Sequence, residues 1–229
     1  MHDMTDDTRL DALLAAEKQA ESLFDAIEAR GLIAVGRSER EIERDIFALA
    51  EQEFGVRTHW HKRIVRAGPN TISIFDENPP IRQIEADDIV FLDLGPVFEA
   101  WEADVGRTYV IGDDPAKHKL CADLETIFDA LCEHLNTHPE ITGAALYAEA
   151  VRLAEEAGWR FGGTIAGHLV GEFPHARIPG DKNHYRISPA NPTRLRDPDG
   201  NGARKHWIIE VHLVDPWRRF GGFYERLAR

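Results

Sequence analysis

The sequence predicts an α+β protein with one curved, mostly antiparallel β-sheet, one face of which is covered by two pairs of helices. Two observations lead to this fold class. Each half of the chain, about 8–112 and 113–229, has the element order helix, helix, strands. Two apolar runs within 89–112 also have the composition of a buried β-hairpin. We therefore expect residues 1–229 to form one domain built from two similar halves.

The first half is expected to begin with two helices. Apolar residues recur at helical spacing between Thr8 and Arg30. Ser38 and Glu41 have the spacing of a capping box, which predicts a second helix that ends near Gly55. The segments expected before the hairpin are a strand at 59–67, a turn at 68–70, a short strand at 71–75 and a loop at 76–80.

The second half repeats this order. Asp114 and Pro115 are a favourable N-cap and first-turn pair for a helix that runs to about Asn136. Thr142 begins another helix, for which Gly158 is the expected C-terminal stop. The strand-like segments that follow are 159–162, the region near His168, 206–214 and 222–227.

The predicted hairpin carries one aspartate in each of its apolar runs, Asp93 and Asp104. A turn between Phe98 and Glu99 would place these two residues directly opposite each other, with Cβ atoms roughly 5 Å apart. Apposed carboxylates in an apolar sheet repel each other and lose hydration, so a compensating interaction is needed. They could share a proton, pair with a base such as Arg107, or bind a metal ion.

Composition excludes several classes of partner. The formal net charge of −13 argues against nucleic acid, because phosphate binding requires a basic surface. No apolar run approaches the ~20 residues that cross a bilayer, so we expect no membrane insertion. The acidic N-terminal stretch MHDMTDDTRL does not resemble a secretory signal. Cys121 and Cys132 are too far apart along one predicted helix for a disulfide, which favours a cytoplasmic protein with reduced thiols.

Other chemistry-bearing residues occur in four places. His168 and His175 lie in the glycine-containing segment AGHLVGEFPH, which could also be a simple surface bend. Glu210 lies in the apolar run HWIIEVHLV, where an isolated carboxylate must reach solvent or meet a cation. Glu225 lies in a terminal strand, where glutamates are commonly solvated. His59 and His61 share one face of the strand expected at 59–67, as a metal pair or as exposed residues.

Taken together, these residues indicate a metal site. An aspartate pair, a histidine and two glutamates on successive strands provide oxygen ligands and one imidazole without a thiolate. This set suits Mn, Co, Fe or Zn. Four carboxylates can hold two divalent ions ~3.5–4 Å apart, and such a pair polarises a carbonyl and generates a hydroxide nucleophile near neutral pH.

The order and spacing of these residues resemble the pita-bread metallopeptidases, which include methionine aminopeptidase, aminopeptidase P, prolidase and the metal-free relative creatinase. The matching motifs are LDLGPVFEAWEADVGRTYVIG, AGHLVGEFPH, IIEVHL and GGFYERL. The resemblance extends over roughly residues 8 to 227. Within the family, the chain is most similar to the catalytic domain of an Xaa-Pro aminopeptidase without the N-terminal domain. The resemblance therefore implies a pita-bread fold.

The resemblance also implies roles for individual residues. Asp93 would chelate one metal ion, and Asp104 and Glu225 would bridge two. His168 would bind the second ion beside Glu210, which would also move protons. The histidine of the family that hydrogen-bonds the substrate carbonyl or the tetrahedral intermediate corresponds to His175.

The chain departs from the family pattern at several points. Family peptidases usually carry a further substrate-contacting histidine at a position that corresponds to 74–78, where this chain reads IFDEN. His59 and His61 are candidates to replace it from the neighbouring strand. The proline that commonly follows the glutamate of IIEVHL is also missing.

The function expected from the residues and the resemblance is hydrolysis of an amide bond in a short peptide by two divalent ions and a metal-bridging hydroxide. An aminopeptidase of Xaa-Pro or related type is the leading hypothesis. The alternatives are a metal-binding module without peptidase activity and a hydrolase of a small non-peptide amide. The Pro- and Asn-rich stretch from Pro179 to Lys205 is long for a connection, so we expect a lid, a specificity loop or an oligomer contact such as that of a homodimer.

Overall fold

The computed structural model describes residues 5–229, so the first four residues of the acidic N-terminal stretch lie outside the described part. It has a curved antiparallel sheet with the strand order β1-β2-β5-β9-β8-β6, and β7 also pairs with β8. The strands of this sheet are β1 (Ile64–Ala67), β2 (Ile89–Leu94), β5 (Val105–Val110), β6 (Arg160–Phe161), β7 (Gly167–Val170), β8 (His206–Val214) and β9 (Gly221–Leu227). A separate short hairpin consists of β3 (Val97–Phe98) and β4 (Trp101–Glu102). The predicted α+β class with a mostly antiparallel sheet is confirmed.

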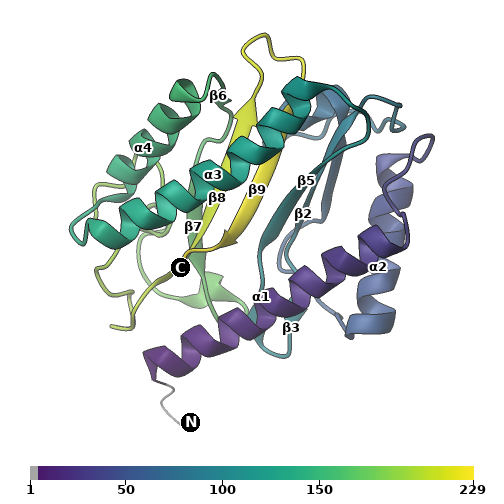
Figure 1. Cartoon of the computed structure of the whole chain (residues 1–229). Coiled ribbons are helices and arrows are strands. Elements are labelled where there is room, and N and C mark those ends of the chain that lie inside the picture. The colour runs from purple at the N-terminus through teal and green to yellow at the C-terminus, as the bar shows by residue number, and fades with distance from the viewer. Residues whose placement is uncertain (1–4) are drawn as a thin grey trace.

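Two helix pairs cover one face of this sheet, as Figure 1 shows. The helices are α1 (Asp6–Ala29), α2 (Glu39–Phe54), α3 (Pro115–Thr137) and α4 (Gly143–Glu156). The helix starts follow their predicted capping residues: Ser38 and Glu41 form a complete capping box, and Asp114 and Thr142 cap α3 and α4. Gly55 ends α2 in the left-handed conformation, with φ of 66°.

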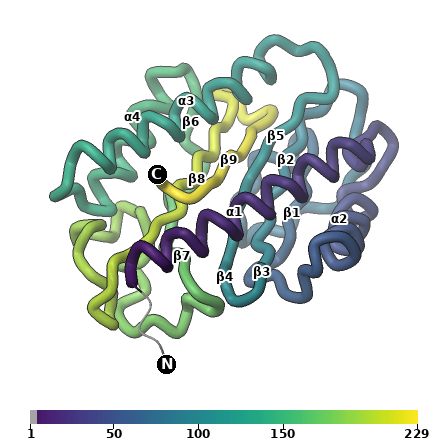
Figure 2. The backbone as a smooth tube through the Cα atoms, turned by 60° about the horizontal axis from the view of Figure 1, so that its bottom comes forward, coloured from purple at the N-terminus to yellow at the C-terminus, as the bar shows by residue number. Residues whose placement is uncertain are grey.

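The buried core consists mainly of two apolar clusters, one beneath each helix pair. One cluster joins α1 and α2 to β1, β2 and β5, and the other joins α3 and α4 to β8. In Figure 2, α1 extends along the molecule from the α2 side toward β7 and β8, and so connects the two halves. Its buried Glu17 accepts a hydrogen bond of 2.7 Å from the backbone N–H of Leu227, at the end of β9.

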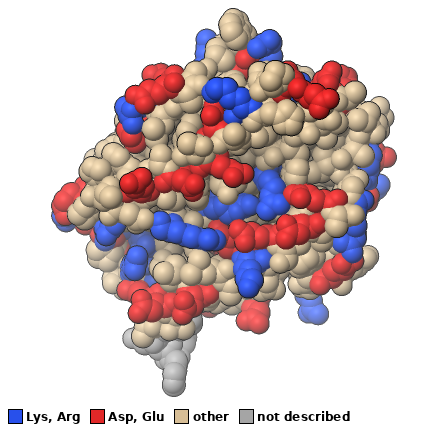
Figure 3. Space-filling view, in the orientation of Figure 1, with Lys and Arg blue, Asp and Glu red and all other residues tan. Residues whose placement is uncertain are grey.

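The helix-covered face has mixed charge. Acidic and basic side chains are interspersed over its helices in Figure 3. Among residues 5–229, no helix is both long and apolar enough to cross a membrane. Cys121 and Cys132, both in α3, are free thiols.

The predicted hairpin register is wrong by two residues. Asp93 pairs with Gly106 rather than with Asp104, because the chain turns at Glu99 and Ala100 between β3 and β4. Glu99 has a φ of 55°, which the turn imposes. A shift of two residues leaves every side chain on its original face of the sheet. Asp93 and Asp104 therefore still project from the same face, as diagonal rather than direct neighbours.

Three further details differ from the prediction. The strand expected at 59–67 is limited to Ile64–Ala67, and residues 68–72 form a 3₁₀ helix where a turn and a strand were expected. Arg107 is not a partner of the two aspartates. Its guanidinium lies on the helix side of the sheet, where Nη1 donates to Glu28 Oε1 at 2.7 Å.

Candidate metal centre

A cavity of about 430 Å³ opens on the sheet face opposite the helices. The two-residue periodicity of the strands explains why its lining is polar. In β2, Val90 and Leu92 pack beneath α1 and α2, whereas Phe91 and Asp93 line the cavity. The same alternation in β8 directs Glu210 into the cavity and its apolar neighbours toward α3 and α4.

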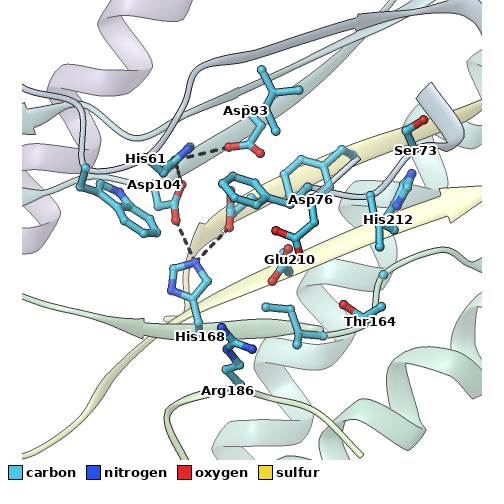
Figure 4. A pocket seen from close by; sticks show the side chains of 18 of the residues that line it. His61, Ser73, Asp76, Asp93, Asp104, Thr164, His168, Arg186, Glu210 and His212 are labelled. Atoms are coloured by element: carbon cyan, nitrogen blue, oxygen red, sulfur yellow. Dashed lines mark hydrogen bonds and ion pairs between the residues drawn. The ribbon is translucent and has the colours of Figure 1, made fainter. Parts of the chain in front are cut away.

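Asp104 lies at the centre of the polar end of the cavity, between two histidines (Figure 4). Its Oδ1 is 3.1 Å from Nε2 of His61, and its Oδ2 is 2.9 Å from Nε2 of His168. Nε2 of His61 is also 3.5 Å from Oδ1 of Asp93, and Nε2 of His168 is 3.6 Å from Oε1 of Glu225. Five side chains from separate segments therefore meet at one point.

Strand pairing brings these segments together. Gly106 of β5 pairs with Asp93 on one side and with Glu225 on the other, and Glu225 in turn pairs with Glu210. A side chain at position 106 would have no space, because a Cβ there would lie 2.6 Å from the Phe223 ring and 3.1 Å from Cβ of Glu225. The glycine thus permits the carboxylates of three strands to lie close together.

Burial and neighbouring charges shift the pKa values of this group of side chains strongly. Burial raises the pKa of Glu210 to about 8 and that of Asp93 to about 6, and it raises the pKa of Glu225 well above its usual value. Burial acts in the same direction on Asp104, but the positive charge of His61 and hydrogen bonds from both histidines lower its pKa overall. The free carboxylates thus repel one another in a poorly hydrated site.

The donor set fits divalent metal ions. His61, Asp93 and Asp104 form one group whose ligand atoms all lie within 4.8 Å of one another, and Asp104, His168 and Glu225 form a second. Oε1 of Glu210 is buried and has no hydrogen-bond partner in the part of the chain that the structure describes. A cation coordinated by these oxygens would remove both the repulsion and the unsatisfied acceptor.

His175 also lines the cavity. Two residues that were not predicted from the sequence, Glu102 and Trp60, hold its side chain in place. Its Nδ1 lies 2.6 Å from Oε2 of Glu102, and its backbone N–H donates to Oε1 of the same carboxylate at 2.9 Å. The ring of Trp60 packs edge-on against His175 at 5.1 Å. Glu102 is only 1% exposed. Its position in the polar part of the hairpin sequence gave no sign that it would be buried.

The two histidines proposed to contact substrate are separated by the fold. His61 lies in the cavity beside Asp104, whereas His59 does not line the cavity and instead packs near Phe47, with ring centroids 6.0 Å apart. The segment that lacks the family histidine does reach the site. Phe75 and Asp76 line the cavity there, and Figure 4 shows Asp76 among the side chains of the site.

Part of the stretch from Pro179 to Lys205 forms a wall of the cavity. Lys182, Tyr185 and Arg186 line it. Arg186 is exposed, and its guanidinium makes no ion pair within residues 5–229. The wall is anchored because Ile187 exchanges backbone hydrogen bonds with Ala166 and Gly167 on either side of the start of β7. Movement of this stretch as a lid and its role in oligomerisation remain predictions.

Comparison with solved structures shows the same fold in peptidases. A prolidase from Thermococcus sibiricus is 24% identical, with a TM-score of 0.70 over 97% of this chain and 56% of its own. A prolidase from Pyrococcus furiosus is 21% identical, with a TM-score of 0.71 over 96% of this chain and 60% of its own. Zinc-substituted aminopeptidase P from E. coli, solved with product, is 14% identical, with a TM-score of 0.65 over 95% of this chain and 52% of its own.

This chain therefore spans little more than half the length of these structural relatives. Curated proteins give no match. The model of metallopeptidase family M24 matches residues 11–197, which include Asp93, Asp104, His168 and His175 but end before Glu210 and Glu225. Because this match covers most of the chain, the protein belongs to metallopeptidase family M24 and has the pita-bread fold of that family.

Proposed function

We propose that this protein is a metal-dependent hydrolase of peptide bonds that uses two divalent ions, and that it is an aminopeptidase of Xaa-Pro or related type. The observation that carries the proposal is the convergence of four carboxylates and a histidine on one cavity, where Oε1 of Glu210 has no hydrogen-bond partner among residues 5–229. Membership of a metallopeptidase family and the fold shared with prolidases and aminopeptidase P support the reaction class.

In this proposal Asp93, Asp104, His168, Glu210 and Glu225 hold the two ions. Bound divalent ions would polarise the scissile carbonyl and lower the pKa of a water molecule. The chain's own groups supply the remaining functions. Glu210, whose carboxylate lines the cavity beside these residues, would also move protons during the reaction.

His175 lies beside the metal-binding residues, with its ring stacked 6.0 Å from that of His168. Its Nδ1 is engaged by Glu102, so Nε2 is the ring atom available to a substrate carbonyl oxygen. This arrangement would stabilise the negative charge that develops on that oxygen.

The cationic wall of the cavity favours short substrates. Lys182 and Arg186 line the cavity, which has carboxylates and histidines at its other end. A dipeptide or tripeptide bound with its scissile bond at Asp104 would extend its C-terminal carboxylate toward these positive charges. A guanidinium is well suited to bind a carboxylate.

Metal analysis combined with an activity screen tests the proposal. Purified protein supplemented with Mn, Co or Zn should retain about two ions per chain. In a panel of Xaa-Pro peptides, Met-initiated peptides and non-peptide amides, it should cleave at least one of the peptides. Asp104→Ala should abolish both properties, whereas Asp129→Ala, at an exposed aspartate of α3, should change neither.

Protein without bound metal after supplementation would overturn the proposal. Two bound ions with no turnover across the panel would instead identify a metal-binding module, and cleavage of non-peptide amides alone would identify a different hydrolase.

A further inference from the structure

We propose that His61 is an additional metal ligand, so that each of the two ions has its own imidazole. This inference rests on the proposed metal site and changes its composition. The residues implied by the family resemblance include one histidine, His168, beside the bridging aspartate. In this chain a second histidine occupies the equivalent place on the other side of Asp104.

The two histidines have matching geometry about Asp104. Nε2 of His61 is 3.1 Å from Oδ1, and Nε2 of His168 is 2.9 Å from Oδ2, so each carboxylate oxygen faces one imidazole. Nε2 of His61 also lies 3.5 Å from Oδ1 of Asp93. Atoms separated by about 3.0–3.5 Å can bind one ion at the usual distances of about 2.0–2.2 Å.

The second ring nitrogen is oriented in the same way in both residues. Nδ1 of His61 lies 2.7 Å from the carbonyl oxygen of Lys62, and Nδ1 of His168 lies 2.9 Å from the carbonyl oxygen of Leu169. A carbonyl only accepts, so Nδ1 carries the hydrogen in each ring and Nε2 is directed at the carboxylates. A backbone carbonyl on Nδ1 is the arrangement that typically orients a metal-binding histidine.

The surroundings of His61 are shaped to hold its ring at this point. Its side chain is 6% exposed and lies between Trp60 and Phe75, with ring centroids 4.4 and 5.8 Å away. The residue after Leu94 is Gly95, where a Cβ would lie 2.3 Å from Nε2 of His61. The absence of a side chain at this position thus leaves room for the imidazole next to Asp93.

A second imidazole has a consequence for metal preference. Without His61, the ion held by Asp93 would have only oxygen ligands from the chain, which suits Mn or Mg. Imidazole is a softer donor that favours Zn, Co and Fe over Mn. The site as built should therefore bind Zn more tightly, relative to Mn, than the same site without His61.

Metal binding by His61→Gln provides the test, with His59→Gln as the matched control two residues away and outside the cavity. Wild-type protein and the control should bind two Zn or Co ions, and X-ray absorption should detect an average of one imidazole per ion. In His61→Gln the imidazole count should fall, and one of the two ions should bind at least about 10–100-fold more weakly. The loss should be larger for Zn than for Mn.

A second variant tests the same inference if His61→Gln fails to fold. Gly95→Ala leaves His61 in the sequence but displaces its ring. This variant should also bind one of the two ions more weakly, and the loss of affinity should be larger for Zn than for Mn.

Two bound ions with wild-type affinity and an unchanged imidazole count in His61→Gln would overturn this inference but leave the proposed function intact. A wild-type protein with one ion that gains a second in His61→Gln would also overturn it, because His61 would then act as a cation in place of a metal. No metal in the wild type would refute both the proposed function and this inference.

Discussion

At the scale of single residues, the buried carboxylate of Glu102 connects the hairpin to the histidine proposed to contact substrate. It forms two hydrogen bonds with His175, one to the ring and one to the backbone. Both fix the direction of the imidazole. Glu102 does not line the cavity, so it is a positioning residue for His175.

Replacing Glu102 with Gln should lower kcat while leaving metal content and KM nearly unchanged. The amide has the size of the carboxylate but lacks its charge, and a hydrogen bond to a charged group contributes about 1.5–3 kcal/mol, equivalent to about 10–100-fold in rate. Steady-state kinetics with metal analysis measure the effect. Glu99→Gln, at an exposed position of the same hairpin, should behave as wild type. An unchanged kcat in Glu102→Gln would show that His175 is held adequately without this charge.

At the scale of elements, capping residues mark where helices begin, and the sequence revealed those of α2, α3 and α4 correctly. The first helix was expected from Thr8 but begins at Asp6, capped by Thr5. Ser38 accepts a hydrogen bond from the backbone N–H of Glu41, and the Glu41 carboxylate accepts one of 2.8 Å from the backbone N–H of Ser38. The next residue, Glu39, accepts from the N–H of Ala67 at 2.8 Å. The start of α2 therefore also anchors β1, at the edge of the sheet beside the cavity.

Ser38→Ala should lower the free energy of unfolding by about 1 kcal/mol, because it leaves the backbone N–H of Glu41, at the start of α2, without its partner. Denaturant titration provides the measurement. The control is Ser22→Ala, within α1, where the exposed hydroxyl donates to the carbonyl of Lys18 and alanine favours the helix. Equal losses in the two variants would argue against a capping role for Ser38.

At the scale of the whole molecule, the proposed metal centre would join the two halves of the chain. The first half contributes Asp93 and Asp104, and the second contributes His168, Glu210 and Glu225. Their strands meet where β5 pairs with β9. Without cations, the clustered carboxylates oppose this contact, so bound metal should stabilise the complete fold.

Mn or Zn at about 100 times its Kd should raise the free energy of unfolding by about 2.7 kcal/mol for each independent site. Thermal unfolding of chelator-treated protein, with and without added metal, measures this increase. Asp104→Asn should lose the metal-dependent increase, even where loss of a charge makes the metal-free variant more stable. Asp129→Asn should retain it. An increase that persists in Asp104→Asn would place the stabilising ion elsewhere.

The sequence by itself determined the fold class, the starts of α2, α3 and α4, and the face of the sheet on which the acidic residues lie. These features depend on local properties: capping chemistry, helical spacing and the two-residue alternation of strands. The alternation explains why the two aspartates were placed on one face even though the predicted register was wrong by two residues.

Only the tertiary structure decided which histidine enters the site and which residues surround it. His59 and His61 would share one face of a continuous strand, but the segment that contains them lies outside β1. Packing against Trp60 and Gly95 directs only His61 into the cavity. Glu102 likewise became buried through contact with His175, far away in the chain. Such contacts depend on how distant segments pack, which local sequence patterns do not encode.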